Sequence, residues 1–359
     1  MAIALVLLIV FLWQLPSSRE YQADVNSEAI DRLEKVLSFS YDETRNLELS
    51  EERILGLHAD HFRFMNLDGI ELGEENLNLK ELGYRKFNSG LIFGDTAEAG
   101  NNVYYYEADK LCWSSPLSGV FAGAVKGKDE IAVIDNPDKS YPSLHLLRLT
   151  DGNRIYSLSF AESGYISDVQ FTPDFQALDV LLINTKKNEL QAIIKRYDLQ
   201  GGQMSQYTPL TKGRFYHSLA YMGSKLVLAS DEAILLIDRE ADEAETELKY
   251  DAVYKLISRN NSVIALVRKE AGRAQELVEI TPDAGEKQLL KLDSRVQVIS
   301  EHNTQLFIAA GRRLYIYNLA RGEIQAEVKL GDEAMALSFG SDGIVYLLTA
   351  TGVHKLILS

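Results

Sequence analysis

The stretch His58-Ala59-Asp60-His61 places two potential metal ligands three residues apart. On a helix this spacing puts both imidazole rings on one face, as many zinc sites require. The surrounding pattern predicts a strand and a turn instead, and in a strand positions 58 and 61 point to opposite faces. We therefore predict no metal site here. The other four histidines are expected to be structural or exposed: His145, His217, His302 and His354.

Two acidic stretches stand out in the sequence. Asp135 to Ser140 (DNPDKS) offers several oxygen ligands for calcium but lacks the D-x-D-x-D-G spacing of a calcium loop, so a solvated turn is predicted. The run from Arg239 to Glu247 (READEAETE) is expected to be a hydrated loop between strands that repels anions.

Motifs for nucleophilic or phosphate chemistry are also weak. Phe339-Gly340-Ser341-Asp342-Gly343 does not match the G-x-S-x-G elbow and reads as a hairpin turn. Gln200-Gly201-Gly202-Gln203 has no lysine or helix after it, so it is not a phosphate cradle. The single cysteine, Cys112, is expected to be a small buried residue beside Trp113. No catalytic, cofactor-binding or metal site is predicted, although 52 acidic residues leave a catalytic carboxylate pair open.

The composition is that of a globular protein, with 46% hydrophobic and 25% charged residues among 359. The net charge of −15 argues against a nucleic-acid partner, because phosphate binding needs a concentrated cationic surface. One cysteine allows no disulfide within the chain.

The N-terminus is the most apolar part of the sequence. Residues Met1 to Leu15 are apolar except Gln14, which predicts a transmembrane signal anchor over residues 1–16. No small-x-small cleavage site follows, so an uncleaved anchor is favoured over a removed signal peptide. The large domain that follows is expected on the extracytoplasmic side of a bacterial cell membrane.

Residues 17–50 are predicted to form a stalk. Asn26 or Ser27 can cap a short amphipathic helix in which Ile30, Leu33, Val36 and Leu37 recur at helical spacing. The segment Val36 to Tyr41 could then be extended.

The stretch from Gln305 to Leu330 exemplifies the rest of the chain, residues 51–359. Leu314 and Ile316 alternate with Tyr315 and Tyr317, a polar turn follows, and Ile324, Ala326, Val328 and Leu330 alternate with polar residues. This period-two pattern predicts a β-hairpin with one buried face, on which all four of these apolar residues are expected to lie.

Similar hairpins recur, each with a polar turn rich in Asp and Gly. From Asp68 through Asp109, Asp151, Asp198 and Asp238 to Asp283, the turns are 41, 42, 47, 40 and 45 residues apart. Such a period, with several short strands in each unit, predicts an all-β fold: a β-propeller of seven or eight four-stranded blades. A two-sheet sandwich uses similar strands but normally closes within about 100 residues. Candidate innermost strands are Ile166 to Phe171, Tyr216 to Tyr221, Leu256 to Ser258 and Val296 to Ser300. The last unit lacks an outer strand, which Val36 to Tyr41 could supply.

These features resemble the quinoprotein-like and WD40-like propeller superfamily and, more narrowly, a family of uncharacterised bacterial membrane-anchored β-propeller proteins. The narrower resemblance depends on the order of anchor, stalk and propeller, and on Tyr106 to Trp113, Tyr165 to Asp174 and Ile194 to Asp198. It implies fold and topology but no activity.

The Trp-Asp signature of WD40 blades is missing. Quinone-dependent dehydrogenases need a cofactor-stacking Trp, whereas only Trp13 and Trp113 are present, so no quinone cofactor is expected. A lipoprotein-anchored propeller that assists outer-membrane β-barrel assembly has a similar architecture, but the lipid-bearing Cys is absent here.

The function predicted is a membrane-tethered, exported module that binds a protein, an envelope component or another ligand. Two alternatives stay open: a polysaccharide hydrolase or lyase that uses carboxylates at the axial face, and a structural subunit of an envelope or secretion assembly.

Overall fold

The computed structural model describes residues 30–38, 47–50, 53–58, 61–87, 90–107, 110–136, 141–161, 164–185, 190–238, 244–270, 272, 274–340 and 344–358. Within these ranges the regular secondary structure consists of 32 β-strands, which form eight antiparallel sheets of four strands. Each sheet corresponds to one predicted blade. The count is eight because the segment around Ile54 to Leu72 belongs to a complete sheet. The chain divides into two compact units, residues 41–296 and residues 1–40 with 297–359.

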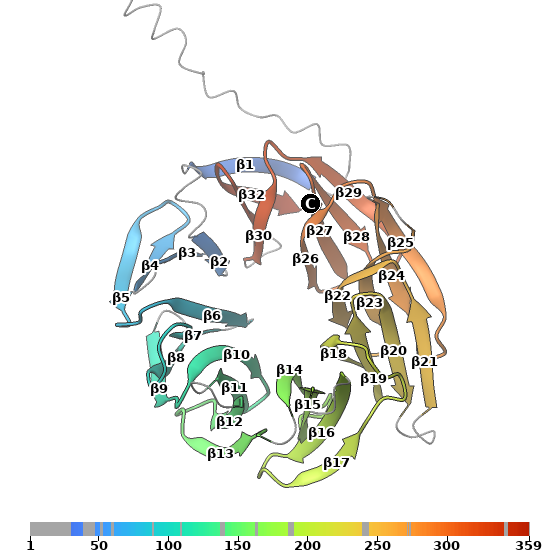
Figure 1. The fold of residues 1–359 in the computed structure, drawn as a ribbon. Helices are drawn as coiled ribbons and strands as arrows, with labels where there is room; N and C mark the ends of the chain where they lie inside the picture. The colour runs from blue at the N-terminus through green and yellow to red at the C-terminus, as the bar shows by residue number, and fades with distance from the viewer. Residues whose placement is uncertain are drawn as a thin grey trace, which may run out of the picture. The chain divides into compact units, whose positions relative to one another are not determined.

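The larger unit contains six blades, in each of which neighbouring strands follow one another along the chain. The first strand of each blade lies on the inner side of this unit and the fourth on the outer side (Figure 1). Blade 1 comprises β2 (Leu47–Ser50), β3 (Arg53–Leu57), β4 (His61–Asn66) and β5 (Glu71–Asn76). Blade 2 comprises β6 (Leu82–Phe87), β7 (Gly90–Asp95), β8 (Asn102–Glu107) and β9 (Lys110–Pro116). Blade 3 comprises β10 (Val120–Lys126), β11 (Glu130–Asn136), β12 (Ser143–Arg148) and β13 (Arg154–Ser159). Blade 4 comprises β14 (Tyr165–Phe171), β15 (Ala177–Asn184), β16 (Gln191–Asp198) and β17 (Gln203–Tyr207). Blade 5 comprises β18 (Tyr216–Met222), β19 (Lys225–Ser230), β20 (Ala233–Asp238) and β21 (Ala244–Lys249). Blade 6 comprises β22 (Ala252–Ser258), β23 (Val263–Arg268), β24 (Gln275–Ile280) and β25 (Glu286–Leu292).

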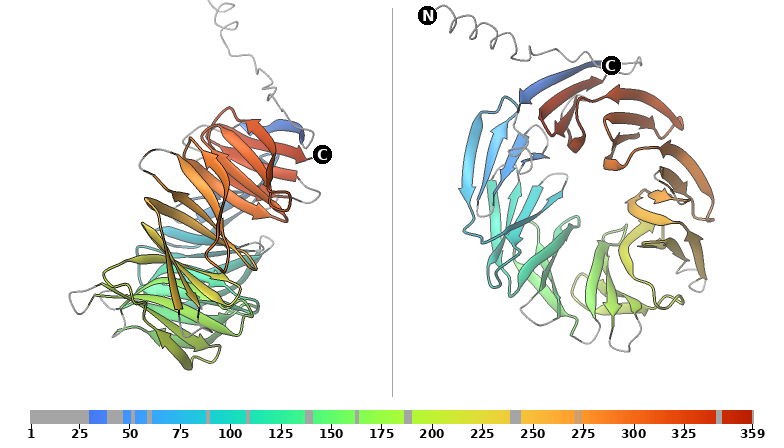
Figure 2. Two further views of the ribbon diagram at one scale, coloured as in Figure 1. Left: turned by 90° about the vertical axis from the view of Figure 1, so that its right-hand side faces the viewer. Right: turned by 45° about the horizontal axis from the view of Figure 1, so that its top comes forward.

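The smaller unit contains the other two blades, and its blade 8 combines both ends of the chain. Its fourth strand, β1, comes from the N-terminal part and pairs with the last strand, β32, as Figure 2 shows. Blade 7 comprises β26 (Val296–His302), β27 (Gln305–Ala310), β28 (Arg313–Asn318) and β29 (Glu323–Lys329), and blade 8 comprises β30 (Ala334–Phe339), β31 (Ile344–Thr349), β32 (Gly352–Leu358) and β1 (Ile30–Ser38).

The strand β1 confirms the predicted outer strand, but it begins six residues earlier than Val36 and contradicts the predicted helix. Register shifts in its pairing with β32, one of them between Lys35 and Leu37, break the strict alternation of a strand. Apolar residues therefore recur at intervals of three and four, which imitates a helical stripe. Leu33 packs against the apolar cluster that blades 7 and 8 share.

The recurring polar turns join the third and fourth strands of the blades. In blade 4, for example, Asp198 Oδ1 accepts hydrogen bonds from the backbone N–H groups of Gln200 at 2.9 Å and Gly202 at 2.8 Å. Gly201 between them has φ +90°, a conformation that glycine adopts without strain. The Asp and Gly periodicity in the sequence therefore marks one particular turn of blades 1 to 7.

The hairpin that first indicated the fold forms as predicted, with one difference. Ala326, Val328 and Leu330 are buried, but Ile324 is 44% exposed. A register shift between Ile316 and Tyr317 in the pairing of β28 with β29 explains this, because the extra residue reverses the face to which Ile324 points.

Within each unit the hydrophobic core lies between neighbouring blades. Leu181 and Ile194 of blade 4, for example, pack with Leu228 and Leu235 of blade 5. This packing explains why the second and third strands read as continuous apolar runs such as Ala233–Asp238.

No helix in the described ranges has the length and hydrophobicity needed to cross a membrane. The predicted anchor, residues 1–16, lies outside the described residues.

Candidate functional site

The two histidines of the possible metal pair lie side by side. His58 follows β3 and His61 begins β4, and the backbone N–H of His58 donates to the carbonyl of His61 at 2.9 Å. Their rings stack with centroids 4.3 Å apart, so the prediction that they point to opposite faces is wrong: the hairpin, not one strand, sets their geometry. The guanidinium Nη2 of Arg63 lies 3.0 Å from His58 Nε2 and would repel a cation. Among the described residues, no group of three or more His, Cys, Asp or Glu side chains is arranged to hold a metal ion.

Asp135, considered above as a calcium ligand, faces the interior of blade 3. Its carboxylate is fully buried, and Oδ2 accepts hydrogen bonds from the backbone N–H groups of Ser118 at 3.0 Å and Gly119 at 2.8 Å. Burial alone would raise the pKa of Asp135, but His145 and these donors outweigh it and hold the pKa below its usual value. The predicted solvated turn is therefore wrong for Asp135, whereas residues 137–140 lie outside the described residues.

His145 combines with Asp135 and Ser157 in an arrangement that the sequence analysis missed. His145 Nδ1 lies 2.7 Å from Ser157 Oγ, and His145 Nε2 lies 3.1 Å from Asp135 Oδ1. The residue types are those of a serine hydrolase, but the imidazole is reversed: in a catalytic triad Nε2 faces the serine and Nδ1 the carboxylate, whereas here Nδ1 faces Ser157 and Nε2 faces Asp135. The backbone donors beside it, Ser118 and Gly119, point at Asp135 and so are not available for an oxyanion. We interpret the three residues as a structural tie across β11, β12 and β13.

Trp113 and Cys112 point to opposite faces of β9. Trp113 is buried, and its Nε1–H donates to the carbonyl of Leu149 at 2.7 Å, which fastens blade 2 to blade 3. A Cβ at Gly152 would approach the indole ring to 2.5 Å, so glycine is required there. Cys112 is exposed, contrary to prediction, because strand alternation turns it outward when Trp113 is inward.

The innermost strands share a β-bulge at the same position in four consecutive blades. The register with the second strand shifts between Phe121 and Gly123, Ile166 and Asp168, Tyr216 and Ser218, and Val253 and Lys255. Bulges re-aim side chains and are frequent beside functional sites. The extra residues are Ala122, Ser167, His217 and Tyr254, four different side chains, so the repetition is architectural.

Asp168, directly after one bulge, is the carboxylate on these strands that most resembles a catalytic group. Burial is the main influence on it and raises its pKa, while the backbone N–H groups of Leu219 and Val169 oppose this. Asp168 Oδ2 accepts from Leu219 at 2.7 Å and Oδ1 from Val169 at 2.8 Å. Both oxygens thus have backbone donors, and one of these donors lies in the next blade, as expected of a structural link.

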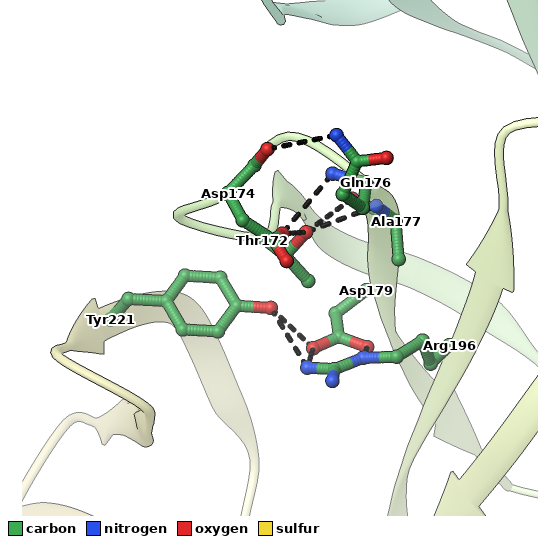
Figure 3. A network of polar contacts seen from close by, with 7 residues as sticks. All are labelled: Thr172, Asp174, Gln176, Ala177, Asp179, Arg196 and Tyr221. Carbon is green, nitrogen blue, oxygen red and sulfur yellow. Dashed lines mark hydrogen bonds and ion pairs between the residues drawn. The ribbon is translucent and has the colours of Figure 1, made fainter.

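A second polar cluster joins blades 4 and 5 (Figure 3). Arg196 binds the fully buried carboxylate of Asp179 in a bidentate manner, with Nε to Oδ1 at 2.9 Å and Nη2 to Oδ2 at 2.7 Å. The hydroxyl of Tyr221, from blade 5, donates to Asp179 Oδ2. Burial, and then Asp179, raise the pKa of Tyr221, so it stays a neutral donor. The carboxylate of Asp179 is thus held by Arg196 and Tyr221, as expected of a structural link between blades 4 and 5.

The connection from blade 4 to blade 5, residues 208–215, is held in place by polar contacts at both ends. The backbone N–H of Leu210 donates to Glu245 Oε1 at 2.8 Å, and the Tyr207 hydroxyl donates to the same oxygen. Arg214 pairs with Glu247, and the N–H of Gly213 donates to the carbonyl of Leu190 at 3.0 Å. Both glutamates belong to β21, so the prediction of a hydrated loop is wrong for this part of the acidic run.

The loop 208–215 presents large apolar side chains to solvent. Leu210 is 78% exposed and Phe215 47% exposed. Connections between blades lie at the same end of the sheets as the starts of the first strands, so Tyr165, which begins β14, and Tyr254, near the start of β22, lie at this end too. We call Tyr165, Leu210, Phe215 and Tyr254 the apolar end of blades 4 to 6. No motif in the sequence marks Leu210 or Phe215 as functional, since single exposed apolar residues are common on protein surfaces.

The described sheets and their order define an eight-bladed β-propeller with four-stranded blades. The chain belongs to a family of unknown function, DUF5711, whose model matches residues 28–358. None of the curated proteins that were compared with the sequence is a match.

Similar solved structures include BamB from Moraxella catarrhalis, which is 14% identical with a TM-score of 0.56; the match covers 90% of this chain and 99% of that one. Sqt1 from Saccharomyces cerevisiae is 12% identical with a TM-score of 0.57, and the match covers 93% and 98% of the two chains. The computationally designed protein Ika8 is 13% identical with a TM-score of 0.59, covering 91% and 100%. At these identities the similarity defines the fold alone.

Proposed function

We propose that this protein is a protein-interaction module, tethered to the bacterial cell membrane by residues 1–16, with the propeller on the extracytoplasmic side. The observation behind the proposal is the loop 208–215, on which Leu210 and Phe215 are held in solvent by contacts to Glu245, Glu247 and Leu190.

Apolar side chains on a fixed loop suit protein binding for a physical reason. Burying Leu210 and Phe215 against a partner would release about 1.5–3 kcal/mol each. Part of such a gain is normally lost when a mobile loop becomes ordered, and the contacts of the loop 208–215 reduce that loss.

The composition of Met1 to Leu15, apolar except for Gln14, supports the tether. A membrane anchor confines the apolar end of the propeller near membrane-bound partners and so raises its effective concentration there. A fusion of alkaline phosphatase after Ser359 tests the topology: we expect activity on the extracytoplasmic side, and activity of a cytoplasmic reporter instead would refute it.

The surroundings of Asp168 do not favour the alternative of a polysaccharide hydrolase. Such an enzyme needs two carboxylates about 5–10 Å apart, one of them protonated. Both oxygens of Asp168 instead accept backbone hydrogen bonds, from Leu219 at 2.7 Å and Val169 at 2.8 Å, which fits a structural carboxylate.

The proposal is tested by crosslinking the full-length protein in native membranes and identifying what copurifies. Leu210→Asp should abolish recovery of a specific partner. Ile324→Asp is the matched control, since Ile324 is also an exposed apolar residue, on the outer strand of blade 7. Equal recovery with both variants would exclude the loop 208–215 as the binding site.

A further inference from the structure

The outer strand of each blade is the edge of its sheet, and such edges invite unwanted pairing with other chains. Proteins usually protect an edge with charged side chains, because pairing would desolvate them. Among the eight described outer strands, seven contain at least one charged residue: β1, β5, β9, β13, β21, β25 and β29. The eighth, β17, reads Gln-Met-Ser-Gln-Tyr and has none.

The edge of β17 is also accessible and regular. It pairs with β16 on one side and is the last strand of its sheet, on the outer side of its unit (Figure 1). Met204 is 61% exposed, and Gln203 and Gln206 are exposed as well. A register shift is confined to the beginning of the strand, and Ser205 to Tyr207 pair regularly with Arg196 to Ile194.

The strand leads directly into the loop 208–215. Tyr207, the last residue of β17, is buried and donates to Glu245, the same residue that accepts from the N–H of Leu210. The end of the uncharged edge is therefore fixed relative to the exposed side chain of Leu210. An added strand would meet an apolar contact there that could set its register.

We propose that β17 accepts an extended, uncharged segment of the partner protein as a fifth strand of blade 4, with Met204 and Leu210 contacting its apolar side chains. This inference rests on the proposed function and specifies how the partner binds. Backbone hydrogen bonds would supply the affinity, as in other cases of strand addition, and the neighbouring apolar side chains the specificity.

The charges on the chain indicate the chemistry of the segment. If an uncharged strand pairs with β17, no charged side chain of β17 is buried without a partner. A charged strand would find no opposite charge on β17. The net charge of −15 opposes an acidic segment, and it also opposes a second copy of this chain.

The test uses three labelled ten-residue peptides of alternating valine and threonine, with both ends blocked. One is neutral, one has two threonines replaced by glutamate, and one has two replaced by lysine. Binding to the full chain is followed by fluorescence anisotropy. We expect the neutral peptide to bind at least tenfold more tightly than either charged peptide.

The decisive variant is Met204→Lys combined with Gln206→Lys. It should weaken binding of the neutral peptide at least tenfold and make the glutamate peptide the tighter ligand, a gain that a misfolded protein would not show. Leu72→Lys, on the outer strand of blade 1, is the control and should change neither value. Unchanged binding of the neutral peptide to the double variant would overturn the proposal, as would an equal loss with Leu72→Lys. A wild-type dimer that the double variant dissociates would also overturn it, since the occupant would then be a second copy.

Failure of this inference is distinguishable from failure of the proposed function. If Leu210→Asp abolishes recovery of the partner from membranes while Met204→Lys with Gln206→Lys has no effect, the interaction module stands and strand addition is excluded. If neither change affects recovery, both are excluded.

Discussion

The carboxylate of Asp179 is fully buried, and Arg196 and Tyr221 stabilise its charge there. Contacts of this kind cannot be predicted from the sequence, since the three residues belong to three strands of two blades. Asp135 illustrates the same limit. Its place in an acidic stretch suggested an ion ligand. In the structure its side chain is buried, and its carboxylate accepts hydrogen bonds from the backbone N–H groups of Ser118 and Gly119.

We expect Arg196→Met to destabilise the protein by about 3 kcal/mol, because it leaves the charge of Asp179 buried without its main partner. The value lies at the lower end of the usual range, since a quarter of the Arg196 side chain is exposed. Urea unfolding measures the loss. The double variant Asp179→Leu with Arg196→Met should recover most of it, and a double variant as unstable as the single one would contradict this explanation.

At the scale of elements, the strand β1 determines whether blade 8 is complete. Alternating and continuous apolar runs were sufficient to predict most strands of the chain, including the innermost strands β14, β18, β22 and β26. They failed for β1 because its bulges change the spacing of Leu33 and Leu37. Bulges are properties of strand pairing, so one strand read alone does not reveal them.

Removing β1 should leave β32 as an unprotected edge and uncover the apolar cluster around Leu33. We expect a chain that begins at residue 42 to unfold at lower urea concentration and to aggregate, as measured by denaturation and light scattering. A chain that begins at residue 28, where the family match begins, should match the full propeller. Equal stability of the two truncated chains would mean that β1 is dispensable.

Blade 8 should also weaken in mild acid because of His354, which faces Lys35 across the pairing of β1 with β32. Burial, and then Lys35, lower the pKa of His354 from its usual 6.5 to about 4. Between these values the unfolded chain binds the proton more readily, so stability falls as pH drops from about 6.5 to 4, by roughly 3 kcal/mol at most. Hydrogen exchange of β1 and β32 over this range measures the effect. His354→Gln should remove this pH dependence, and a pH dependence that persists in this variant would assign it to another group.

At the scale of the whole molecule, the repeat of polar turns was sufficient to predict a propeller, because the turn between the third and fourth strands keeps an Asp, Asn or Gly residue in blades 1 to 7. The site was not predictable in this way. Leu210 and Phe215 are ordinary apolar residues in the sequence, and only the contacts of Glu245 and Glu247 with their loop distinguish them from other exposed side chains.

The measurement that tests the central claim most directly is site-specific photocrosslinking of the full-length protein in native membranes. A photoreactive residue replaces Leu210 in one sample and Ile324 in the other, so that two exposed apolar positions are compared. Binding through the loop 208–215 predicts one defined protein adduct at position 210 and none at position 324. The absence of an adduct at position 210, or the same adducts at both positions, would contradict the account.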